Sequence, residues 1–438
     1  MRKIKKIIKN VPGISLMARK ARLFLQSYEY KRALSRIKST KEKIIQRHLN
    51  APDKKIVVAF IIQYIPSWNK LKPVYDKLIK DNDFKVLLLC VPSLFNETRI
   101  DKSVCNTTEN DTFNYFKNNG YECINALQNG TWFDLEKCEP DYIFHSRPYN
   151  HFMPKPYTSS EISKYALICN VLYAASLTYH GQEVTLNFDY FKNVCFYFAF
   201  DKFEAEFYQK RLHIGIKRGI QKCYTYGATG LEQVLTQKSK RNNIFFKKTV
   251  IWTPRWSTDI HIGGSNFFRY KKTIEFLIDN YSDVLFIIRP HPLMFGNFIK
   301  TGEMSEQEVT DFKNYCYNRI NVLLDEEKEY VDTFWQSDYL ISDASGIVPE
   351  YYVTNKPIIY CNSNADFAYA DYALEMFKNS YIVNDSEELI KAFKLLYSDN
   401  DYKKIDREKS FISIFGDIQN SSKGIEKVLR SGIKQYIN

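Results

Sequence analysis

The stretch DYLISDASGIVPEYYVTNKPIIY (Asp338–Tyr360) places a strand, a short turn, a helix and a second strand in direct succession. The first apolar run ends at Ser342 and Asp343, and the small residues Ala344–Gly346 follow as a turn before the helical segment. A tight hairpin joins antiparallel strands, whereas parallel strands need a long crossover connection, which is usually a helix. Two strands joined through a helix are therefore expected to be parallel. The stretch therefore predicts an α/β fold in which helices cover a parallel sheet.

The same alternation of strands and helices extends over most of the chain. The predicted strands are KIVVAFIIQ, FKVLLLCV, DYIFHS, ALICNVLYA and NVCFYFAF in the first half, and TVIWTP, DVLFIIRP, NVLLD, DYLISD and KPIIYC in the second. The pattern stops at Thr236–Lys248, which is polar, basic and without periodicity, and this segment predicts a domain boundary. The expected parts are residues 1–50, a basic amphipathic segment, residues 51–240, residues 249–415, and residues 416–438, a C-terminal helix.

Composition excludes several classes of protein. The chain has 438 residues, 45% of them hydrophobic, which is enough for more than one core. Its apolar runs, such as Ile56–Ile62, fall short of the ~20 residues that a membrane-spanning helix needs. The nine cysteines are scattered and form no C-x-x-C pair, which argues against a zinc site or a disulfide framework. Met1–Lys20 lacks the continuous apolar region of a secretory signal, so a cytoplasmic protein is expected.

The net charge of +12 is concentrated in residues 1–50. Glu29 and Glu42 are the only acidic residues of that segment, and the remainder of the chain is close to neutral. Pro12 and Gly13 are expected to divide it into a short and a longer basic helix. Such helices bind anionic membrane surfaces, although packing on the body or on a second copy is the alternative. Nucleic acid is not an expected partner, since the body carries no basic excess.

Three predicted strand ends of the second half carry groups suited to a diphosphate. Arg255 follows the first strand, Arg289 and His291 follow the second, and the third leads into the turn at Ser345. The carboxyl ends of parallel strands share one edge of the sheet, so these groups are expected to lie together. Arginines, a histidine and a helix start are typical ligands of phosphate oxygens. No pair of aspartates is placed to hold Mg²⁺, so metal-independent chemistry without a cofactor is expected.

Further groups of the same segment complete a nucleotide-binding hypothesis. Ser342 and Ser345 offer hydroxyl groups beside Asp343, and Gly346 permits close approach of a ligand to the backbone. Glu350, one turn into the helix, can accept hydrogen bonds from both hydroxyls of a ribose. The alternative is a capped helix without a ligand, because Ser and Asp are also favoured helix caps.

Two successive α/β units suggest the GT-B architecture, with two Rossmann-like domains and a cleft between them. The ordered motifs WTPRW, RPHP and ISDASGIVPEYYVTNKPIIY resemble the CDP-glycerol glycerophosphotransferase family of teichoic-acid and capsule synthesis. PDYIFHSRPYNHFMP (Pro140–Pro154) is similar to the first half of that family. The sequence departs from the family where "SS" is replaced by "ASG" and "PTWR" by "TPRW", which leaves the identity of the donor open.

The resemblance implies that the C-terminal domain holds a CDP-linked donor. It implies transfer of glycerol phosphate, or of another polyol phosphate, to a hydroxyl of a lipid-linked polymer. His291 would match the family's histidine beside the donor diphosphate, and Ser342 and Ser345 its phosphate-binding segment. Members act at the cytoplasmic face of the membrane, so a peripheral location at the inner face is expected.

The catalytic base is expected to be a histidine, because a neutral imidazole can accept the proton of the attacking hydroxyl. His180, in YHGQEVTL, is the candidate from the family's His-Gly motif, and His145 competes with it. Arg147 and Tyr149 are expected to contact an acceptor phosphate. His48, His213 and His261 are expected at the surface.

Two other functions remain compatible with the sequence. A GT-B glycosyltransferase that uses a nucleotide sugar needs the same phosphate and ribose contacts. A non-catalytic, membrane-associated assembly scaffold would bind membrane and partners without a nucleotide.

Overall fold

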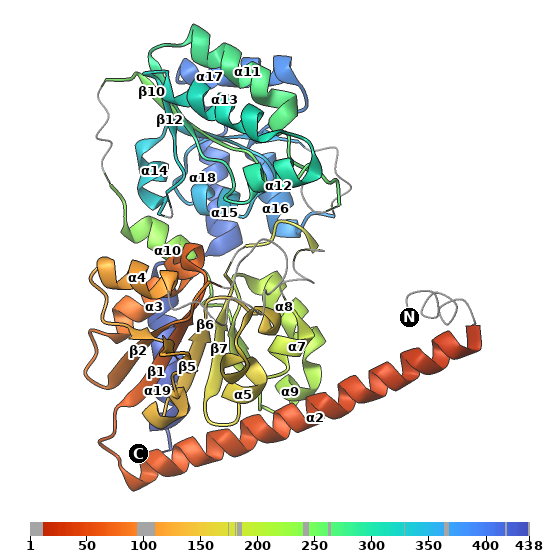
Figure 1. The fold of residues 1–438 in the computed structure, drawn as a ribbon, viewed down its shortest axis with the longest axis vertical. Coiled ribbons are helices and arrows are strands. Elements are labelled where there is room, and N and C mark those ends of the chain that lie inside the picture. The colour runs from red at the N-terminus through yellow and green to blue at the C-terminus, as the bar shows by residue number, and fades with distance from the viewer. Residues whose placement is uncertain are drawn as a thin grey trace.

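The computed structural model describes residues 12–93, 110–173, 175–179, 181, 186–239, 245–261, 264–327, 329–362, 368–416 and 418–436, with only the backbone for residues 12–25. The chain forms two α/β units that are stacked along its longest axis, with a long helix across the lower unit (Figure 1). This confirms the predicted fold class, two Rossmann-like units with a helical segment before them.

The sheet of the first unit is parallel throughout and has the strand order β3-β2-β1-β6-β7-β8-β9. Its strands are β1 (Ile56–Ile62), β2 (Phe84–Cys90), β3 (Ile124–Asn125), β6 (Tyr142–His145), β7 (Leu167–Val171), β8 (Val194–Phe198) and β9 (Lys222–Tyr224). A small antiparallel pair, β4 (Leu127–Gln128) and β5 (Thr131–Trp132), lies outside it. Every residue of β1 is apolar and buried, as expected for a central strand that is covered on both faces.

The second unit repeats this topology with the strand order β12-β11-β10-β13-β14-β15. Its strands are β10 (Lys248–Thr253), β11 (Val284–Ile288), β12 (Val322–Leu324), β13 (Tyr339–Ser342), β14 (Ile358–Cys361) and β15 (Tyr381–Val383), all parallel. In both sheets the first strand lies between the second and the fourth. This order creates a switch point at the carboxyl ends of β1 and β6 and of β10 and β13, where α/β proteins bind ligands.

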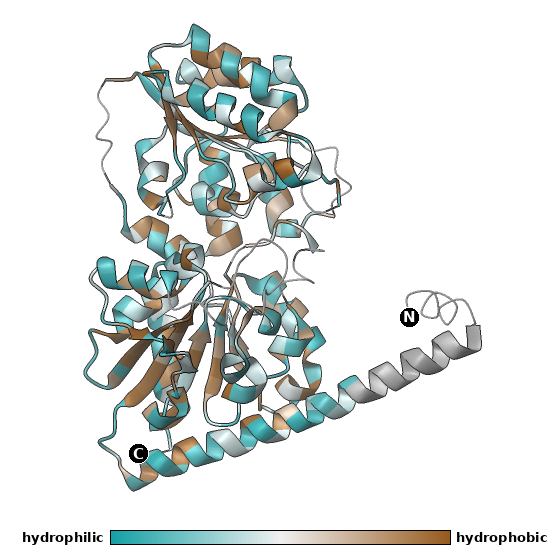
Figure 2. Ribbon diagram, viewed as in Figure 1, coloured by the Kyte–Doolittle hydropathy of each residue, from teal (hydrophilic) through white to brown (hydrophobic). Residues whose placement is uncertain are grey.

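Helices cover both faces of each sheet (Figure 1). Those of the first unit are α3 (Trp68–Leu78), α4 (Asp111–Asn118), α5 (Ser159–Ile162), α7 (Phe188–Phe191), α8 (Lys202–Arg211), α9 (His213–Lys217) and α10 (Thr229–Thr236). Those that follow are α11 (Phe267–Asn280), α12 (Met294–Thr301), α13 (Glu306–Tyr317), α14 (Val331–Gln336), α15 (Ile347–Tyr352), α16 (Asp371–Lys378), α17 (Ser386–Tyr397), α18 (Lys404–Phe415) and α19 (Ser421–Lys434). Apolar residues concentrate in the strands and on the inner helix faces (Figure 2).

The strands that the sequence predicts are all present, but parts of the second unit were not predicted. These are α12, directly after the RPHP segment, and the elements α16, β15, α17 and α18. The predicted boundary falls between the end of α10 and the start of β10.

The C-terminal helix α19 returns from the second unit to pack on the first. Leu429 and Ile433 are buried in the core formed by β1, β2 and α3, and the Tyr142 hydroxyl donates to the Leu429 carbonyl at 3.0 Å. Gly432 is required at the contact, because a Cβ atom there would lie 2.4 Å from the Tyr142 hydroxyl oxygen. The two units are therefore joined at the end of the chain as well as at its middle.

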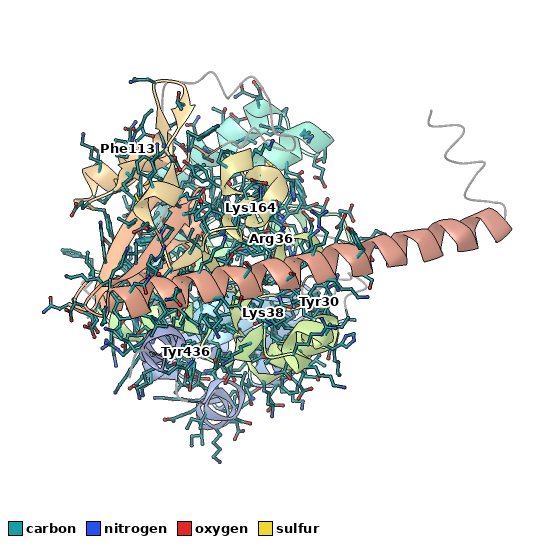
Figure 3. The ribbon with its side chains drawn as sticks, turned by 90° about the horizontal axis from the view of Figure 1, so that it is seen from below. Tyr30, Arg36, Lys38, Phe113, Lys164 and Tyr436 are labelled. Atoms are coloured by element: carbon teal, nitrogen blue, oxygen red, sulfur yellow. The ribbon has the colours of Figure 1, made fainter. Side chains whose placement is uncertain are left out.

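The first helix, α2 (Pro12–Asn50), runs along the bottom of the first unit and extends beyond it (Figure 3). A proline at the first helical position suits a helix start, so Pro12 begins the helix. Between residues 26 and 50 one face is buried on the body by a stripe at helical spacing: Tyr30, Ala33, Leu34, Ile37, Thr40, Ile44 and His48. Residues 26–50 of α2 are therefore part of the fold of the first unit. For these residues the alternative prediction, packing of the N-terminal segment on the body, is confirmed.

His48 is not the surface residue that the sequence suggested. Its ring is fully buried, and Nε2 lies 3.0 Å from the carboxylate of Asp141, which also accepts the Val57 amide proton at 2.8 Å. His48 lies on the same face of α2 as the other buried residues, because its position follows their helical spacing. The composition of the segment does not indicate this spacing. His213 and His261 are exposed, as predicted.

Candidate functional site

The switch point of the second unit is held together by a pair of hydroxyl groups. Thr253 and Ser342 are register partners at the ends of β10 and β13. The Thr253 hydroxyl donates to the Ser342 oxygen at 2.7 Å, and the Ser342 hydroxyl donates to the Asp343 carbonyl at 2.9 Å. Both side chains are buried, so Ser342 joins two strands and its hydroxyl is already engaged.

Asp343 fixes the loops that surround this point. Its buried carboxylate accepts hydrogen bonds from the Arg255 amide at 2.9 Å, the Asn266 amide at 3.2 Å and the Asn266 side-chain amide at 2.9 Å. The pKa of Asp343 is raised by burial, and these donors offset only part of that rise. The aspartate therefore ties the WTPRW segment and the start of α11 to the end of β13, and it acts as an organiser of the site.

Arg255 contacts the turn that precedes α15, and His291 lies close enough to Arg255 to feel its charge. The Arg255 guanidinium donates to the Ala344 carbonyl, and its pKa is lowered chiefly by burial. The Arg289 and His291 amides donate to the Trp252 and Pro254 carbonyls at 2.8 and 3.2 Å, which fixes the RPHP segment against β10. The WTPRW and RPHP segments therefore lie side by side, as the shared sheet edge requires.

The surroundings of His291 favour the neutral form of its ring. Burial and, second, the positive charge of Arg255 lower its pKa to about 4. Its Nδ1 accepts a hydrogen bond from the Leu293 amide at 3.2 Å, so the neutral ring carries its proton on Nε2. At neutral pH the ring is therefore uncharged and can donate one hydrogen bond to an anion.

The turn itself begins a short helix. Ser345 and Gly346 are half-buried, and Gly346 is the residue before α15 with no side-chain cap for the helix amides. The Val348 amide donates to the Ser345 carbonyl at 3.0 Å. Because α15 is only six residues long, its N-terminus alone does not define an anion site.

Arg289 does not join Arg255 and His291. Its guanidinium pairs with the Asp325 carboxylate at 2.6 Å and donates to the Glu327 carbonyl at 2.5 Å, and it lies over the Tyr330 ring. Asp325 directly follows β12, the strand beside β11. Because Asp325 and Arg289 lie far apart along the chain, no local sequence pattern predicts this ion pair.

Glu350 lies in a buried contact between the two units. Its carboxylate accepts hydrogen bonds from the Tyr330 hydroxyl at 2.6 Å and from the Asn69 amide at 3.4 Å, and it pairs with the Lys70 ammonium group at 2.7 Å. Asn69 and Lys70 come from α3 of the first unit, and sequence reasoning did not single them out. No local motif marks them, since only the packing of the units brings them to Glu350.

The switch point of the first unit carries the predicted acceptor residues. Arg147 is buried after β6, donates to the Gln63 side chain at 3.2 Å, and lies over the rings of Tyr64 and Phe152. Burial lowers its pKa to about 10. Tyr149 is hydrogen-bonded to the Tyr173 hydroxyl at 3.0 Å. A guanidinium among aromatic rings at a sheet edge is suited to a phosphate group.

The candidate bases differ in their surroundings. His145 is buried, with Nε2 2.9 Å from the Tyr157 carbonyl and Nδ1 3.0 Å from the Tyr190 hydroxyl, and burial lowers its pKa to about 4. With both ring nitrogens occupied, it has the environment of a structural histidine. His180 lies outside the described residues. Its neighbour Tyr179 donates its amide proton to the Ala368 carbonyl of the second unit at 2.9 Å.

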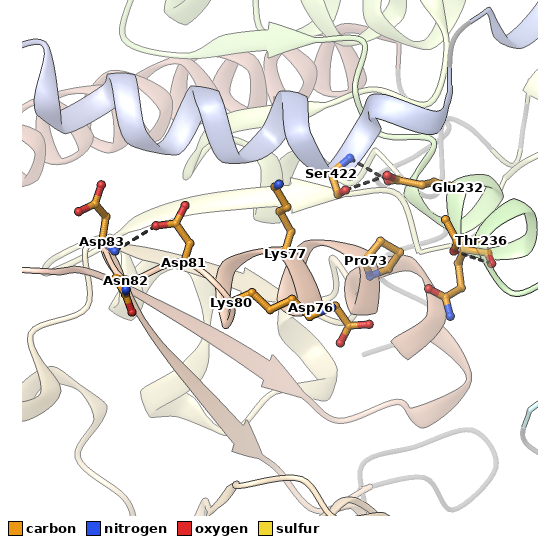
Figure 4. A pocket seen from close by; sticks show the side chains of 11 residues that line it. Pro73, Asp76, Lys77, Lys80, Asp81, Asn82, Asp83, Glu232, Thr236 and Ser422 are labelled. Carbon is orange, nitrogen blue, oxygen red and sulfur yellow. Dashed lines mark hydrogen bonds between the residues drawn. The ribbon is translucent and has the colours of Figure 1, made fainter.

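An open cavity of about 730 Å³ lies elsewhere, between α3, α10 and α19 (Figure 4). It is lined by Pro73, Asp76, Lys77, Lys80, Asp81, Asn82, Asp83, Glu232, Gln233, Thr236 and Ser422. Asp81–Asp83 directly precede β2, so the cavity lies toward the amino ends of the strands, opposite to the switch points. We assign no role in catalysis to it.

The described ranges contain neither a metal-binding cluster nor a membrane-spanning helix. No group of three or more His, Cys, Asp and Glu side chains there is arranged to hold a metal ion. None of the helices in these ranges combines the length and the apolar character that a bilayer span requires.

Two Rossmann-like units, with a final helix that returns to the first, place the protein in the GT-B class of folds. Residues 230–430 match the family described as CDP-glycerol:poly(glycerophosphate) glycerophosphotransferase. This part of the chain is similar to that family, and the similarity identifies the protein as a transferase. The match runs from α10 through the second unit and into α19, whereas the similarity at Pro140–Pro154 lies outside it.

Solved structures with the same fold cover most of the chain. S. aureus MnaA with UDP is 14% identical, with a TM-score of 0.56 over 87% of this chain and 97% of that one. UDP-GlcNAc 2-epimerase from Neisseria meningitidis, bound to UDP-GlcNAc, is 14% identical, with a TM-score of 0.54 over 86% and 99%. The wall teichoic acid polymerase TagF, soaked with CDPG, is 11% identical, with a TM-score of 0.54 over 96% and 99%. These identities show the fold alone. The comparison with curated proteins gives no match.

Proposed function

We propose that this transferase moves glycerol phosphate, or another polyol phosphate, from a CDP-linked donor to a hydroxyl of a lipid-linked cell-wall or capsule polymer. The observation that carries the proposal is the group of Arg255, His291 and the turn at Ala344, at the switch point of the unit that matches the family. TagF, which shares the fold and was soaked with CDPG, supports a CDP-linked donor.

The donor diphosphate binds beside Arg255, the Nε2 proton of His291 and the Ser345–Gly346 turn. Glu350 accepts a hydrogen bond from the ribose. Ser342 and Asp343 do not contact the donor. They fix the backbone at Thr253 and Arg255 through hydrogen bonds. Arg289 acts at one remove, because its guanidinium is engaged with Asp325 and lies over Tyr330.

In the reaction an acceptor hydroxyl attacks the β-phosphorus of the donor. A new oxygen–phosphorus bond forms, the bond from the β-phosphorus to the bridging oxygen breaks, and CMP leaves with the bonding electrons. The hydroxyl proton passes to His180, which we keep as the base because both ring nitrogens of His145 are occupied. Arg255 and His291 stabilise the charge that develops on the departing phosphate.

The acceptor binds at the carboxyl edge of the first sheet, with a phosphate group beside Arg147 and Tyr149. The aromatic rings around Arg147 suit a phosphate that carries an apolar or carbohydrate portion. The two substrates then approach from edges that belong to different units, as transfer between them requires.

The N-terminal segment binds the cytoplasmic membrane surface in this proposal. Residues 26–50 are docked on the body, which leaves residues 1–25 for the membrane contact. Residues 1–25 contain no acidic residue, and each Lys or Arg near an anionic surface contributes about 1 kcal/mol. The protein therefore acts as a peripheral enzyme at the inner face.

Deletion of residues 1–25 tests the membrane contact without removing the docked half of α2. The shortened protein is expected to lose binding to vesicles that contain anionic lipid, while its melting temperature stays close to that of the full chain. Deletion of residues 1–50 is a poorer test, because it strips the buried stripe from the first unit. Unchanged vesicle binding would contradict the anchor.

The donor is identified by a screen for CMP or UDP release in the presence of acceptor, using CDP-glycerol, CDP-ribitol, UDP-sugars and CMP-sugars. The proposal expects CMP release from a CDP-polyol. Release from a nucleotide sugar alone would support a glycosyltransferase. Absence of release, together with no thermal shift by CMP or CDP, would support a scaffold.

A further inference from the structure

A buried polar cluster joins the two units at the N-terminal end of α3. Lys70 donates to the Tyr330 hydroxyl at 2.8 Å and pairs with Glu350 at 2.7 Å. Asn69 donates to the same hydroxyl at 2.8 Å. The side chains of Lys70 and Glu350 are only 9% and 5% exposed, so this is an internal ion pair that spans two domains.

The first unit is shaped to hold Lys70 in this position. Thr229 donates its side-chain hydroxyl proton to the Lys70 carbonyl. The alkyl part of Lys70 packs against Gly230, where a Cβ atom would lie 3.2 Å from the lysine Cδ and Cγ atoms. The ammonium group lies over the Tyr330 ring, 5.5 Å from its centroid. An ammonium group in such surroundings needs a partner of opposite charge, and Glu350 supplies it.

The hydrogen bonds among the described residues do not use every acceptor position of the Glu350 carboxylate. Oε2 accepts from Tyr330 and Asn69, and Oε1 accepts from Lys70. A carboxylate offers about four acceptor positions, two on each oxygen, so the partners in the described part of the chain leave one position on Oε1. The three partners fix the rotamer of Glu350 and thereby the direction of that last position.

We infer that Lys70 is a positioning residue that orients Glu350, from the opposite domain, toward one ribose hydroxyl of the CDP-linked donor. The inference rests on the proposed function, since it needs a ribose at Glu350. It adds that the ribose site is complete only while the two units are in contact. Lys70 itself touches neither the ribose nor the diphosphate.

The role of Lys70 is tested by comparing how wild type and a Lys70 variant discriminate between CMP and its deoxy analogues. Binding of CMP, 2′-deoxy-CMP and 3′-deoxy-CMP is measured by calorimetry for the wild type and for Lys70→Met, which keeps the alkyl packing and removes the charge. The wild type is expected to bind CMP on the order of tenfold more tightly than one of the deoxy nucleotides. In Lys70→Met that preference is expected to fall toward one, because CMP loses affinity and the deoxy nucleotide does not.

Lys72→Met is the matched control, since Lys72 lies on the same helix and pairs with Asp76 near the surface. It is expected to keep the wild-type preference, and Glu350→Gln is expected to lose it. Where Lys70→Met does not fold, Lys70→Gln is used with the same expectation. The structure of each variant is checked by circular dichroism and melting temperature.

The outcomes separate the inference from the function on which it rests. Equal losses for CMP and both deoxy nucleotides in Lys70→Met would mean that Lys70 only supports packing of the domains. Tighter binding of CMP would mean that Lys70 competes with the ribose. Either result overturns the inference while the function stands, whereas a wild type that binds no CMP overturns both.

Discussion

The two switch points share one topology but carry different chemistry. In each, a serine at the carboxyl end of the fourth strand joins it to the first strand. Ser342, the last residue of β13, accepts from Thr253, and Ser146, directly after β6, accepts from the Gln63 amide at 3.1 Å. The residues that follow diverge. The second unit continues with Asp343 and a small turn, whereas the first continues with a buried arginine among aromatic rings. The serines thus belong to the fold, and the residues after them determine what each edge binds.

The largest expected effect is at the edge of the second unit. His291→Ala removes a hydrogen-bond donor to the donor phosphates, so kcat/KM for transfer is expected to fall by about 100-fold or more. The ring is only half-buried, so the melting temperature is expected to change little. Steady-state kinetics with CDP-glycerol measures the loss, and His261→Ala, at an exposed position, is the control. Turnover near the wild-type level would remove His291 from the site.

A smaller effect is expected at the edge of the first unit. Arg147→Met keeps the contact with Tyr64 and Phe152 but loses the charge, so KM for the acceptor is expected to rise by roughly thirtyfold. Binding of CMP is expected to stay unchanged, because the donor lies on the other edge. Arg218→Met serves as the exposed control. A loss of CMP affinity in Arg147→Met would show that the two edges do not divide the substrates in this way.

The smallest expected effect concerns stability, and it comes from a comparison of two buried carboxyl groups, Asp343 in the second unit and Glu204 in the first. Asp343 is held by amide donors, whereas burial and the charge of Asp201 raise the pKa of Glu204 to about 8. The native protein therefore keeps the Glu204 proton over a range in which the unfolded chain has lost it. Stability from this group is present below the unfolded pKa and is lost as pH rises toward 8.

Glu204→Gln has no proton to lose at this position. Relative to the wild type, its free energy of unfolding is expected to improve by about 1 kcal/mol between about pH 6.5 and pH 8. Urea unfolding at the two pH values measures the change, and the lowered pKa of His145 acts alike in both proteins. A difference that does not vary with pH would mean that Glu204 is ionised in the native state.

Local pattern was sufficient to predict most of the fold. The strands were predictable because short apolar runs between turns encode them, and the motifs at Arg255, His291 and Asp343 follow those strands directly. The shared edge of a parallel sheet then brings these residues together without further information.

The rest depends on contacts between distant segments. The ion pair of Arg289 with Asp325 and the contact of Lys70 with Glu350 depend on how neighbouring strands and whole units pack. The surface prediction for His48 is wrong for the same reason, since its partner Asp141 lies 93 residues further along the chain, directly before β6. Residue type at a single position does not encode such pairings.

The central claim is that the edge formed by β10 and β13 holds the CDP-linked donor. A crystal structure of the protein soaked with CDP-glycerol tests it most directly. The account predicts the diphosphate within hydrogen-bond distance of Arg255 and His291, with the ribose at Glu350. A nucleotide bound at the edge of the first unit, or in the cavity between α3, α10 and α19, would contradict it.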